Sequence, residues 1–512
     1  MGREDLMISE RRRKLKEVRD QGINPYPYSF EKKASATELQ EKYINLKSEV
    51  HTKDNTTIAG RLMLFRDMGK IAFGTVQDEG GKIQIVLQEG ETPQKIKEFT
   101  KSSIDIGDFI GVSGTVFRTK RGELSVLVNK IDLLSKSLLP LPDKWHGLED
   151  KEERYRKRHL DLIMSPEVRE VFNKREKIID AIRAFLKERT FHEVDTPYLQ
   201  TIYGGASARP FKTHLNALDI DLFLAISPEL YLKRLIVGGY EKVFTIARNF
   251  RNEGIDRWHN PEFTMMEIYQ AYADYNDMME LTETLIEHIC KEVLGTTKIK
   301  IRDKEIDFKR PWKRITMLEA IKKYAKIDAA KSSEKELTEF ARKNKVEIKG
   351  NTWGMIVQSL FEHFCEKEFE QPTFVIDHPV ETTPLCKPHR NDSTGRLIER
   401  FEVFCLGTEL ANAYSELNDP ALQRIRLEEQ QKQLTSGDEE ANPHDEDFVN
   451  ALEVGMPPTG GLGIGIDRLI ILLTGTDSIR DVILFPFMKP LLSESDKKEQ
   501  REEKDGRTHR KK

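Results

Sequence analysis

The stretch that decides the fold is Arg248-Asn-Phe-Arg-Asn-Glu-Gly-Ile-Asp-Arg-Trp-His-Asn-Pro-Glu-Phe-Thr-Met-Met-Glu-Ile-Tyr269. The apolar residues before it and the run Phe263–Tyr269 predict two buried strands, so residues 254–262 should form the loop of an antiparallel hairpin. Charged residues alternate with apolar ones in both strands, so some charges must point into a cavity, where an unpaired charge is costly. Such a hairpin is usually a surface element held by salt bridges. Alternatively, a cavity that binds an anionic ligand would provide partners for the positive charges that point into it.

Size and composition narrow the class of protein. At 512 residues, the chain is long enough for two or three domains with sizeable cores. Charged residues make up 33% of the sequence, yet the formal net charge is only −4, so any basic surface for nucleic acid must be local. No stretch reaches the apolar length of a membrane span, and the N-terminus lacks the apolar segment of a secretion signal. We therefore expect a cytoplasmic protein without membrane contact.

The cysteines point to a reducing compartment. Cys290, Cys365, Cys386 and Cys405 show no paired spacing, so a disulfide framework is not expected. A zinc site could be imagined from His363, Cys365, Cys386 and His389, but the spacing is not that of a zinc finger.

The first part of the chain predicts a small barrel after a basic helix. Residues 1–56 form an N-terminal helical extension whose basic run at 11–14 is either a solvated helix face or an arm that contacts phosphates. Residues 57–137 contain five short alternating strands, with a short helix between the third and fourth, as in a five-stranded OB-fold barrel. Such barrels stack bases on aromatic side chains. The candidate contacts, each of which could also be ordinary barrel surface, are Arg61, Arg66, Phe73 and Gln84.

The second part of the chain predicts a larger domain. We assign residues 138–164 to a proline-stiffened linker and residues 165–491 to a catalytic domain that opens with a long amphipathic helix from Pro166. Ser227 and Pro228 predict the start of a further helix. Residues 316–370 are helical and charged and are interpreted as an insertion packed on the catalytic body. Residues 492–512 have almost no apolar residue and are expected to be disordered.

Acidic residues occur in two further predicted strands of this domain. Between residues 400 and 418, Glu402, Glu409, Asn412 and Glu416 interrupt apolar residues, and acidic side chains are disfavoured in strands unless a positive group meets them. The glycine run at 460–465 then leads to Arg468 on an apolar helix; such a run serves close backbone approach or simple strand-to-helix packing. Arginines, acidic strands and an aromatic side chain together indicate a nucleotide site with a divalent metal, and no phosphate loop is present.

These stretches resemble the motifs of class II aminoacyl-tRNA synthetases. Residues 191–197 look like the first class motif, residues 248–269 like the second and residues 461–468 like the third. The resemblance covers nearly the whole chain and is closest to lysyl-tRNA synthetases, because Gly204-Gly-Ala-Ser-Ala-Arg-Pro-Phe211 and Pro228-Glu-Leu-Tyr-Leu-Lys-Arg-Leu235 are similar to stretches of that family. The implied fold is α+β: an OB-fold barrel followed by an antiparallel sheet flanked by helices.

The resemblance implies a role for each candidate residue. Arg251 and Arg468 would be catalytic, and Arg251 would bridge the carboxylate of lysine and the α-phosphate of ATP. The expected ATP contacts are Arg251, Glu253, His259, Phe263 and Arg468. Glu402 and Glu409 would hold Mg²⁺. The expected lysine contacts are Gly205, Glu229, Arg251, Glu267, Tyr269, Asn412, Tyr414 and Glu416, with Glu416 and Tyr269 receiving the ε-ammonium group.

The implied reaction is the ATP-dependent formation of lysyl-adenylate, followed by transfer of the lysyl group to the terminal ribose of tRNA(Lys). The implied partners are tRNA(Lys), ATP, L-lysine and a second copy of the chain, paired through the long helix before Pro197. Ala413, Tyr414 and Cys386 depart from the residues common in the family, which affects the tuning of the pocket. Arg257 and Trp258 could contact ATP, the end of the tRNA or only solvent.

Three other interpretations remain at this point. An aspartyl- or asparaginyl-tRNA synthetase shares the barrel and the class motifs, but it would need a cation at the end of the amino-acid pocket. A truncated lysyl transferase that modifies a protein would lack the barrel. A catalytically inactive paralogue could be an RNA-binding or regulatory protein, yet the expected metal and phosphate ligands are all present in this sequence.

Overall fold

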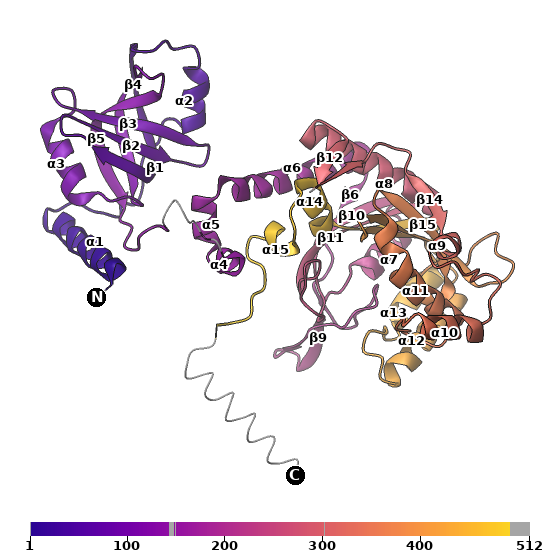
Figure 1. Cartoon of the computed structure of the whole chain (residues 1–512). Coiled ribbons are helices and arrows are strands. Elements are labelled where there is room, and N and C mark those ends of the chain that lie inside the picture. The colour runs from indigo at the N-terminus through magenta and orange to yellow at the C-terminus, as the bar shows by residue number, and fades with distance from the viewer. Residues whose placement is uncertain (1, 143–147, 149, 302, 492–512) are drawn as a thin grey trace. The chain divides into compact units, whose positions relative to one another are not determined.

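The computed structural model describes residues 2–142, 148, 150–301 and 303–491. The chain divides into two compact units between residues 148 and 149, and each is treated by itself (Figure 1). The tail predicted at 492–512 lies outside the described residues. Within the described ranges, no helix has both the length and the apolar character that crossing a membrane requires.

The first unit contains the closed five-stranded barrel that the sequence predicts. Its strands pair in the order β1-β2-β3-β5-β4, and a short helix, α3 (Gln94–Ser103), connects the third strand to the fourth. Alternate apolar residues such as Ile58, Ile85 and Val112 fill the interior, because successive side chains of a strand point to opposite faces. The strands are β1 (His51–Asp67), β2 (Ile71–Gln77), β3 (Lys82–Gln88), β4 (Phe109–Arg118) and β5 (Leu124–Ser135).

Two helices precede the barrel, α1 (Arg3–Asp20) and α2 (Ala36–Lys42). The Arg11 guanidinium donates hydrogen bonds to the carbonyl oxygens of Ile106, Ser137 and Leu139 at 2.8 to 3.1 Å. Lys14 forms an ion pair with Asp105 at 2.7 Å. Part of the basic run at 11–14 therefore serves to attach α1 to the barrel. Contact of the remaining charges with phosphates stays a prediction.

The second unit is built on an eight-stranded sheet in the order β14-β15-β16-β17-β18-β11-β10-β6. All neighbours are antiparallel except the two edge pairs, β14 with β15 and β10 with β6. The predicted hairpin is present as β10 and β11, so the fold class expected from the sequence is confirmed. The strands are β6 (His192–Glu193), β10 (Lys242–Phe250), β11 (Glu262–Ala271), β14 (Lys313–Thr316), β15 (Thr373–Pro379), β16 (Leu397–Cys405), β17 (Thr408–Ser415) and β18 (Thr459–Gly465).

One face of this sheet is covered by helices. Three helices, α6 (Pro166–Glu188), α8 (Tyr275–Ile289) and α14 (Ile466–Thr474), pack with the strands into the largest apolar core (Figure 1). Phe244, Met266 and Ile464 contribute to this core and are fully buried. Because side chains alternate along a strand, the polar residues of the same strands lie on the opposite face. A π-helical turn, η1 (Cys290–Leu294), extends α8.

The predicted linker at 138–164 requires a correction at its C-terminal end. Residues 151–164 form two helices of the second unit, α4 (Lys151–Arg156) and α5 (Arg158–Met164). Arg158 is buried, pairs with Asp161 at 2.7 Å and donates hydrogen bonds to the carbonyl oxygens of Arg480 and Leu484. This segment has the composition of a solvated linker, but Arg158 is buried and finds hydrogen-bond partners far along the chain.

The charged insertion at 316–370 contains three helices with a core of their own, α9 (Met317–Tyr324), α10 (Glu334–Lys343) and α11 (Trp353–Phe364). Val375 and Phe404 of the sheet belong to the same core, which attaches the insertion to strands β15 and β16.

The remaining elements connect or flank the sheet: β7 (Leu199–Gln200), β8 (Lys212–Leu215), β9 (Ile220–Leu224), α7 (Glu229–Val237), β12 (Lys298–Ile301), β13 (Lys304–Asp307), η2 (Glu366–Glu368), η3 (Val380–Thr382), α12 (Pro420–Thr435), α13 (Glu446–Val454) and α15 (Ile479–Val482).

Candidate active site

The register of the sheet collects polar side chains on the face away from the helices. Residues directly opposite each other on antiparallel strands point to the same side. Glu267 lies opposite Gly463, Gly463 opposite Asn412, and Asn412 opposite Glu402. Tyr269 and Tyr414 both lie opposite Gly461. Residues that are far apart in the chain, such as Glu267 and Gly463, are therefore placed side by side.

The glycines of β18 form the floor beneath these side chains. A Cβ atom at Gly461 would lie 1.9 Å from Glu416 Oε1 and 2.6 Å from the Tyr269 ring, so only glycine leaves these two side chains in place. At Gly463 a Cβ would instead meet the end of Met265 at 2.7 Å. Of the two interpretations of the glycine run, the structure therefore supports close approach over simple strand-to-helix packing.

Arg251 follows directly after β10, and its positively charged guanidinium group is partly buried. Its Nε is buried and has no hydrogen-bond partner among the described residues. The guanidinium lies 5.1 Å from the centre of the Phe263 ring. Burial lowers the pKa of Arg251, although it stays charged at neutral pH, because arginine is deprotonated only in strong base. A buried guanidinium with an unpartnered nitrogen is suited to an anionic ligand.

A second cationic group lies at the start of α14. Arg468 donates to the side chain and the carbonyl oxygen of Glu409, each at 3.0 Å, and its NH2 lies 3.2 Å from His259 Nε2. His259 Nδ1 in turn lies 2.8 Å from Asp256. The three residues His259, Arg468 and Glu409 come from the hairpin loop, α14 and β17. The structure brings these three residues together, and their roles stay predictions.

The two carboxylates predicted to bind metal lie on the paired strands β16 and β17. Glu402 is buried and accepts a hydrogen bond from Arg400 at 2.5 Å. Burial raises its pKa to about 7, Arg400 opposes the rise, and Glu409 adds to it. Two neighbouring carboxylates fit a magnesium ion, which prefers oxygen ligands and usually takes only one or two from the protein.

The zinc alternative has no support in the structure. Within the described ranges, which include all four residues named for it, no group of three or more His, Cys, Asp or Glu side chains is arranged to hold a metal. The four cysteines are free and buried.

A cluster of buried carboxylates occupies the other end of the sheet face. Glu267 accepts hydrogen bonds from Ser227 Oγ at 2.7 Å and from the Tyr269 hydroxyl at 3.3 Å. Burial and the charge of Glu229 raise its pKa to about 8. Asn412 accepts from Arg400 and donates to the Tyr414 hydroxyl, which fixes its orientation. Such a cluster has a high cost unless cations meet it.

The α7 helix supplies the remaining charged groups of this end. Ser227 Oγ accepts from the Glu229 backbone at 3.1 Å, and the helix begins at Glu229, one residue later than a Ser227 cap predicts. Gly205 has a φ of +87°, and a Cβ on it would lie 2.9 Å from the Glu229 Cβ, so its backbone lies directly against Glu229. Lys233 pairs with Glu229 at 2.6 Å and with Glu416 at 2.5 Å.

Lys233 lies among the candidate site residues, although the sequence patterns did not indicate it. A glutamate and a lysine four positions apart on a predicted helix usually form a surface pair, whereas Lys233 is completely buried. The sequence signal that could have found it is the apolar character of its neighbours, Leu232 and Ile236, which belong to a buried face.

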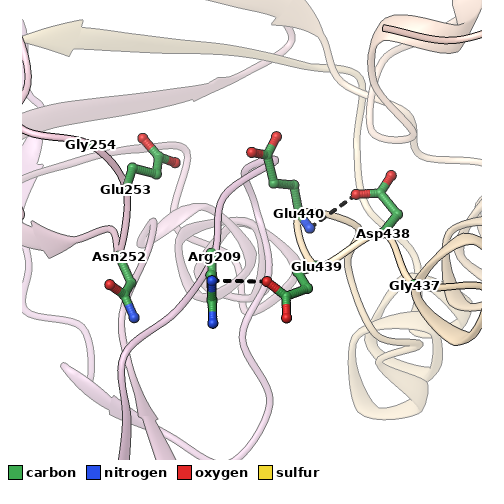
Figure 2. Close-up of a pocket in the computed structure, with 8 residues that line it drawn as sticks. All are labelled: Arg209, Asn252, Glu253, Gly254, Gly437, Asp438, Glu439 and Glu440. Atoms are coloured by element: carbon green, nitrogen blue, oxygen red, sulfur yellow. Dashed lines mark hydrogen bonds and ion pairs between the residues drawn. The ribbon is translucent and has the colours of Figure 1, made fainter. Parts of the chain in front are cut away.

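Next to the predicted adenine contacts lies a cavity of about 430 Å³. Asn252 and Glu253 line one side, and the acidic loop at 437–440 lines the other (Figure 2). Arg209 pairs with Glu439 at 2.9 Å across it.

Farther along the hairpin loop, Arg257 donates to the carbonyl oxygen of Asp477, and Trp258 packs against the main core. These contacts are internal and leave contact of either residue with ATP or tRNA a prediction.

The four barrel candidates share one outer surface. Arg66 lies opposite Phe73, Gln84 opposite Thr75 and Arg61 opposite Gln77. Arg66 is exposed and Phe73 half-buried. Arg61 donates to the Gly107 carbonyl at 2.7 Å, and Gln84 donates to Ser125 at 2.8 Å, so these two already have partners within the barrel.

Comparison with known proteins finds a matching family for each of the two units. Residues 150–489 match the family described as tRNA synthetases class II (D, K and N), and residues 56–134 match the OB-fold nucleic acid binding domain. A lysine–tRNA ligase of Clostridium novyi is 52% identical over 493 residues, which cover 95% of each chain. The chain belongs to the class II lysyl-tRNA synthetase family.

Other relatives of this synthetase are similar to it over nearly the whole chain. A lysine–tRNA ligase of Pelotomaculum thermopropionicum is 53% identical over 95% of the synthetase and 96% of the relative. One from Methanoculleus marisnigri is 51% identical over 93% and 94% of the two chains. Since each match spans both units, the synthetase shares the barrel as well as the sheet with these relatives.

Proposed function

We propose that this chain is a lysine–tRNA ligase, which uses ATP to activate L-lysine and transfers the lysyl group to the 3′-terminal ribose of tRNA(Lys). The observation that carries the proposal is a site with two chemically opposite ends on one sheet face. Arg251 provides a partly buried guanidinium at one end, and Glu267 and Glu416 provide buried carboxylates at the other. A ligand with an anionic group and a cationic side chain suits both ends.

At the acidic end, Glu416 and Tyr269 receive the ε-ammonium of the substrate. Glu267, Asn412 and Tyr414 support them. Glu229 and the carbonyl oxygen of Gly205 receive the α-ammonium, since the backbone of Gly205 lies against Glu229. A neutral side chain would leave the net negative charge of the ionised carboxylates uncompensated in a buried pocket, which costs several kcal/mol. Arginine is excluded by its size and by a guanidinium geometry that differs from that of ammonium.

At the other end, Arg251 bridges the substrate carboxylate and the α-phosphate of ATP. Phe263 stacks on the adenine, and Glu253 accepts a hydrogen bond from the adenine amino group. His259 and Arg468 hold the terminal phosphate, which agrees with the 3.2 Å separation of their nitrogens. Glu402 and Glu409 would hold Mg²⁺, which when bound neutralises charge on the leaving pyrophosphate.

The chemistry follows from positioning and electrostatics and requires no protein nucleophile. An oxygen of the lysine carboxylate attacks the α-phosphorus of ATP, the bond to the β-phosphate oxygen breaks, and pyrophosphate leaves. Arg251 compensates the negative charge that builds up at the reacting phosphate. In the second step the terminal ribose hydroxyl of tRNA attacks the lysyl carbonyl, and AMP leaves.

The barrel serves as the binding domain for the anticodon. Phe73 can stack on a base and Arg66 can meet a phosphate, because both lie on one outer surface of the barrel. We further propose that two copies of the chain pair through α6, the helix that precedes the first class motif, and that the enzyme acts in the cytoplasm.

The strongest competitor is an aspartyl- or asparaginyl-tRNA synthetase. Lys233 is a cation at the acidic end, and such a cation is what an aspartate pocket requires. However, Lys233 is already paired with both Glu229 and Glu416, and Glu267 adds a third carboxylate. The balance at this end is negative, which disfavours an anionic side chain.

Charging of tRNA tests the proposal. The purified chain, ATP and Mg²⁺ should transfer labelled lysine to tRNA(Lys), and tRNA whose terminal ribose has been oxidised by periodate serves as the control. Transfer of lysine to intact tRNA alone supports the assignment. Failure to charge tRNA(Lys) with lysine while labelled aspartate or asparagine is transferred to its own tRNA would assign the chain to the competing enzymes.

A further inference from the structure

Lys233 lies at the buried centre of the amino-acid pocket. It is one helical turn after Glu229 on α7, and its side chain is completely buried. Its ammonium lies 2.6 Å from Glu229 Oε1 and 2.5 Å from Glu416 Oε2. Burial of an unpaired ammonium would lower its pKa, but the two carboxylates outweigh burial, and the pKa of Lys233 is raised. Lys233 is therefore a permanent cation at neutral pH.

The two carboxylates that Lys233 joins have different tasks in the proposed function. Glu229 receives the α-ammonium of the substrate, and Glu416 receives the ε-ammonium. Lys233 forms its ion pair with Oε2 of Glu416 at 2.5 Å, whereas Oε1 lies over Gly461. Neither oxygen has a hydrogen bond of regular geometry among the described residues. The arrangement leaves one oxygen of Glu416 for a second ammonium.

The charges of the pocket also match the substrate. Glu229, Glu267 and Glu416 bring three negative charges, and Lys233 and Arg251 bring two positive ones when all five are ionised. The remaining negative charge complements L-lysine, which carries two ammonium groups and one carboxylate and so has a single net positive charge.

We propose that Lys233 is a positioning residue that sets specificity: by holding Glu229 and Glu416 on one ammonium, it fixes the distance between the two ammonium sites and thereby selects the length of the diamino acid. This inference rests on the proposed function, because it takes both carboxylates as substrate contacts. It goes further because it names the residue that holds the two carboxylates at a fixed distance from each other. Ornithine, which is one methylene shorter than lysine, is the competitor that this spacing rejects.

Lys233 also favours the ionised form of Glu416. Burial raises the pKa of Glu416, Lys233 opposes the rise, and Glu229 and Glu267 add to it. Without Lys233, the pKa of Glu416 should rise further, so a higher pH is needed before Glu416 can attract an ammonium group. The charged and titratable groups around Glu416 are Glu229 and Lys233 from α7, Glu267 and Tyr269 from β11, and Cys386, which pairs with it in an isolated bridge.

The first unit offers a matched control. Lys136 is also buried and pairs with Asp105 at 2.5 Å and with Asp108 at 2.8 Å. It has the same chemistry as Lys233, one ammonium between two carboxylates, but lies in the barrel unit. Lys136→Met therefore reports the general effect of removing such a lysine.

The experiment measures pyrophosphate exchange by the full chain with lysine and with ornithine. Lys233→Met should raise the KM for lysine by about 30-fold or more, leave the KM for ATP within about twofold, and reduce the preference for lysine over ornithine by about tenfold. The wild-type KM for lysine should fall as the pH approaches 8, because Glu416 ionises, and in Lys233→Met this fall should be displaced to higher pH. Lys136→Met should leave all of these unchanged.

Lys233→Arg separates charge from spacing. A guanidinium keeps the positive charge, so the pH profile should resemble that of the wild type, but its planar fork holds the carboxylates at a different distance. The preference for lysine over ornithine should therefore still fall. If Lys233→Met does not fold, this variant decides alone.

Three outcomes would overturn the inference: an unchanged lysine KM in Lys233→Met, equal losses for lysine and ATP, or a wild-type preference for lysine over ornithine in Lys233→Arg. Absence of lysine-dependent exchange by the wild-type chain would instead refute the proposed function itself, so the two failures are distinguishable.

Discussion

Gly461→Ala is the substitution whose effect follows most directly from the geometry of the site. The added Cβ would lie 1.9 Å from Glu416 Oε1 and 2.6 Å from the Tyr269 ring. A non-bonded contact requires more than about 3 Å, so the Glu416 carboxylate must move by about 1 Å or more. It is the end of a flexible side chain and can move, so the fold should survive while the ammonium site is displaced.

A displacement of about 1 Å in a binding group can reduce catalysis by about 100-fold. We therefore expect kcat/KM for lysine in pyrophosphate exchange to fall by about this factor in Gly461→Ala, with little change in the KM for ATP. Gly463→Ala is the matched control, because its Cβ would meet only the terminal methyl group of Met265, which can rotate away. We expect a loss below about fivefold there.

The melting temperature of each variant establishes that it is folded before the kinetics are compared. The reasoning is refuted if Gly461→Ala keeps a wild-type kcat/KM for lysine, or if Gly463→Ala loses as much. Either result would mean that Glu416 and Tyr269 do not contact the substrate over Gly461.

Other predictions address the remaining parts of the site. Glu416→Gln should raise the KM for lysine about 100-fold and leave the KM for ATP nearly unchanged in pyrophosphate exchange, because it removes one partner of a buried ion pair; equal loss of both would contradict the assigned role. Phe73→Ala should raise the KM for tRNA about tenfold in charging assays and not affect exchange, and unchanged charging would argue against base stacking at this position. Glu409→Gln should raise the Mg²⁺ concentration needed for half-maximal exchange, and an unaltered requirement would remove Glu409 from the metal site. Burial raises the pKa of Glu267 and of Glu416 to about 8, above the usual value of 4.5. Between these pH values the folded protein holds protons that the unfolded chain has lost, so the stability of the fold decreases as the pH rises. The melting temperature of the free protein should therefore fall from pH 5 to pH 8. The rise in melting temperature that lysine produces should grow over the same interval, because the ammonium groups of lysine favour the ionised carboxylates. A lysine-induced rise in melting temperature that shrinks as the pH increases would contradict this.

Local patterns predicted much of the fold because the energetics that set them are local. Alternation with a period of two identified all five barrel strands and the β10–β11 hairpin, since one face of each strand must be buried. The acidic residues of β16 and β17 were recognisable as candidate site residues, because strands disfavour acidic side chains without a positive partner.

The sequence patterns could not predict partners that lie far along the chain. Residues 151–164 have the charge of a linker, yet Arg158 is buried on carbonyl oxygens of residues 480 and 484. Lys233 has the spacing of a surface pair with Glu229, and only the fold brings Glu416 to its other side. The glycines of β18 likewise show their purpose only when Tyr269 and Glu416 lie above them.

The most direct test of the central claim is amino-acid-dependent pyrophosphate exchange by the purified wild-type chain, with lysine, aspartate and asparagine supplied separately. Buried carboxylates at one end of the pocket and Arg251 at the other predict exchange with lysine alone. Exchange with aspartate or asparagine and none with lysine would contradict the claim.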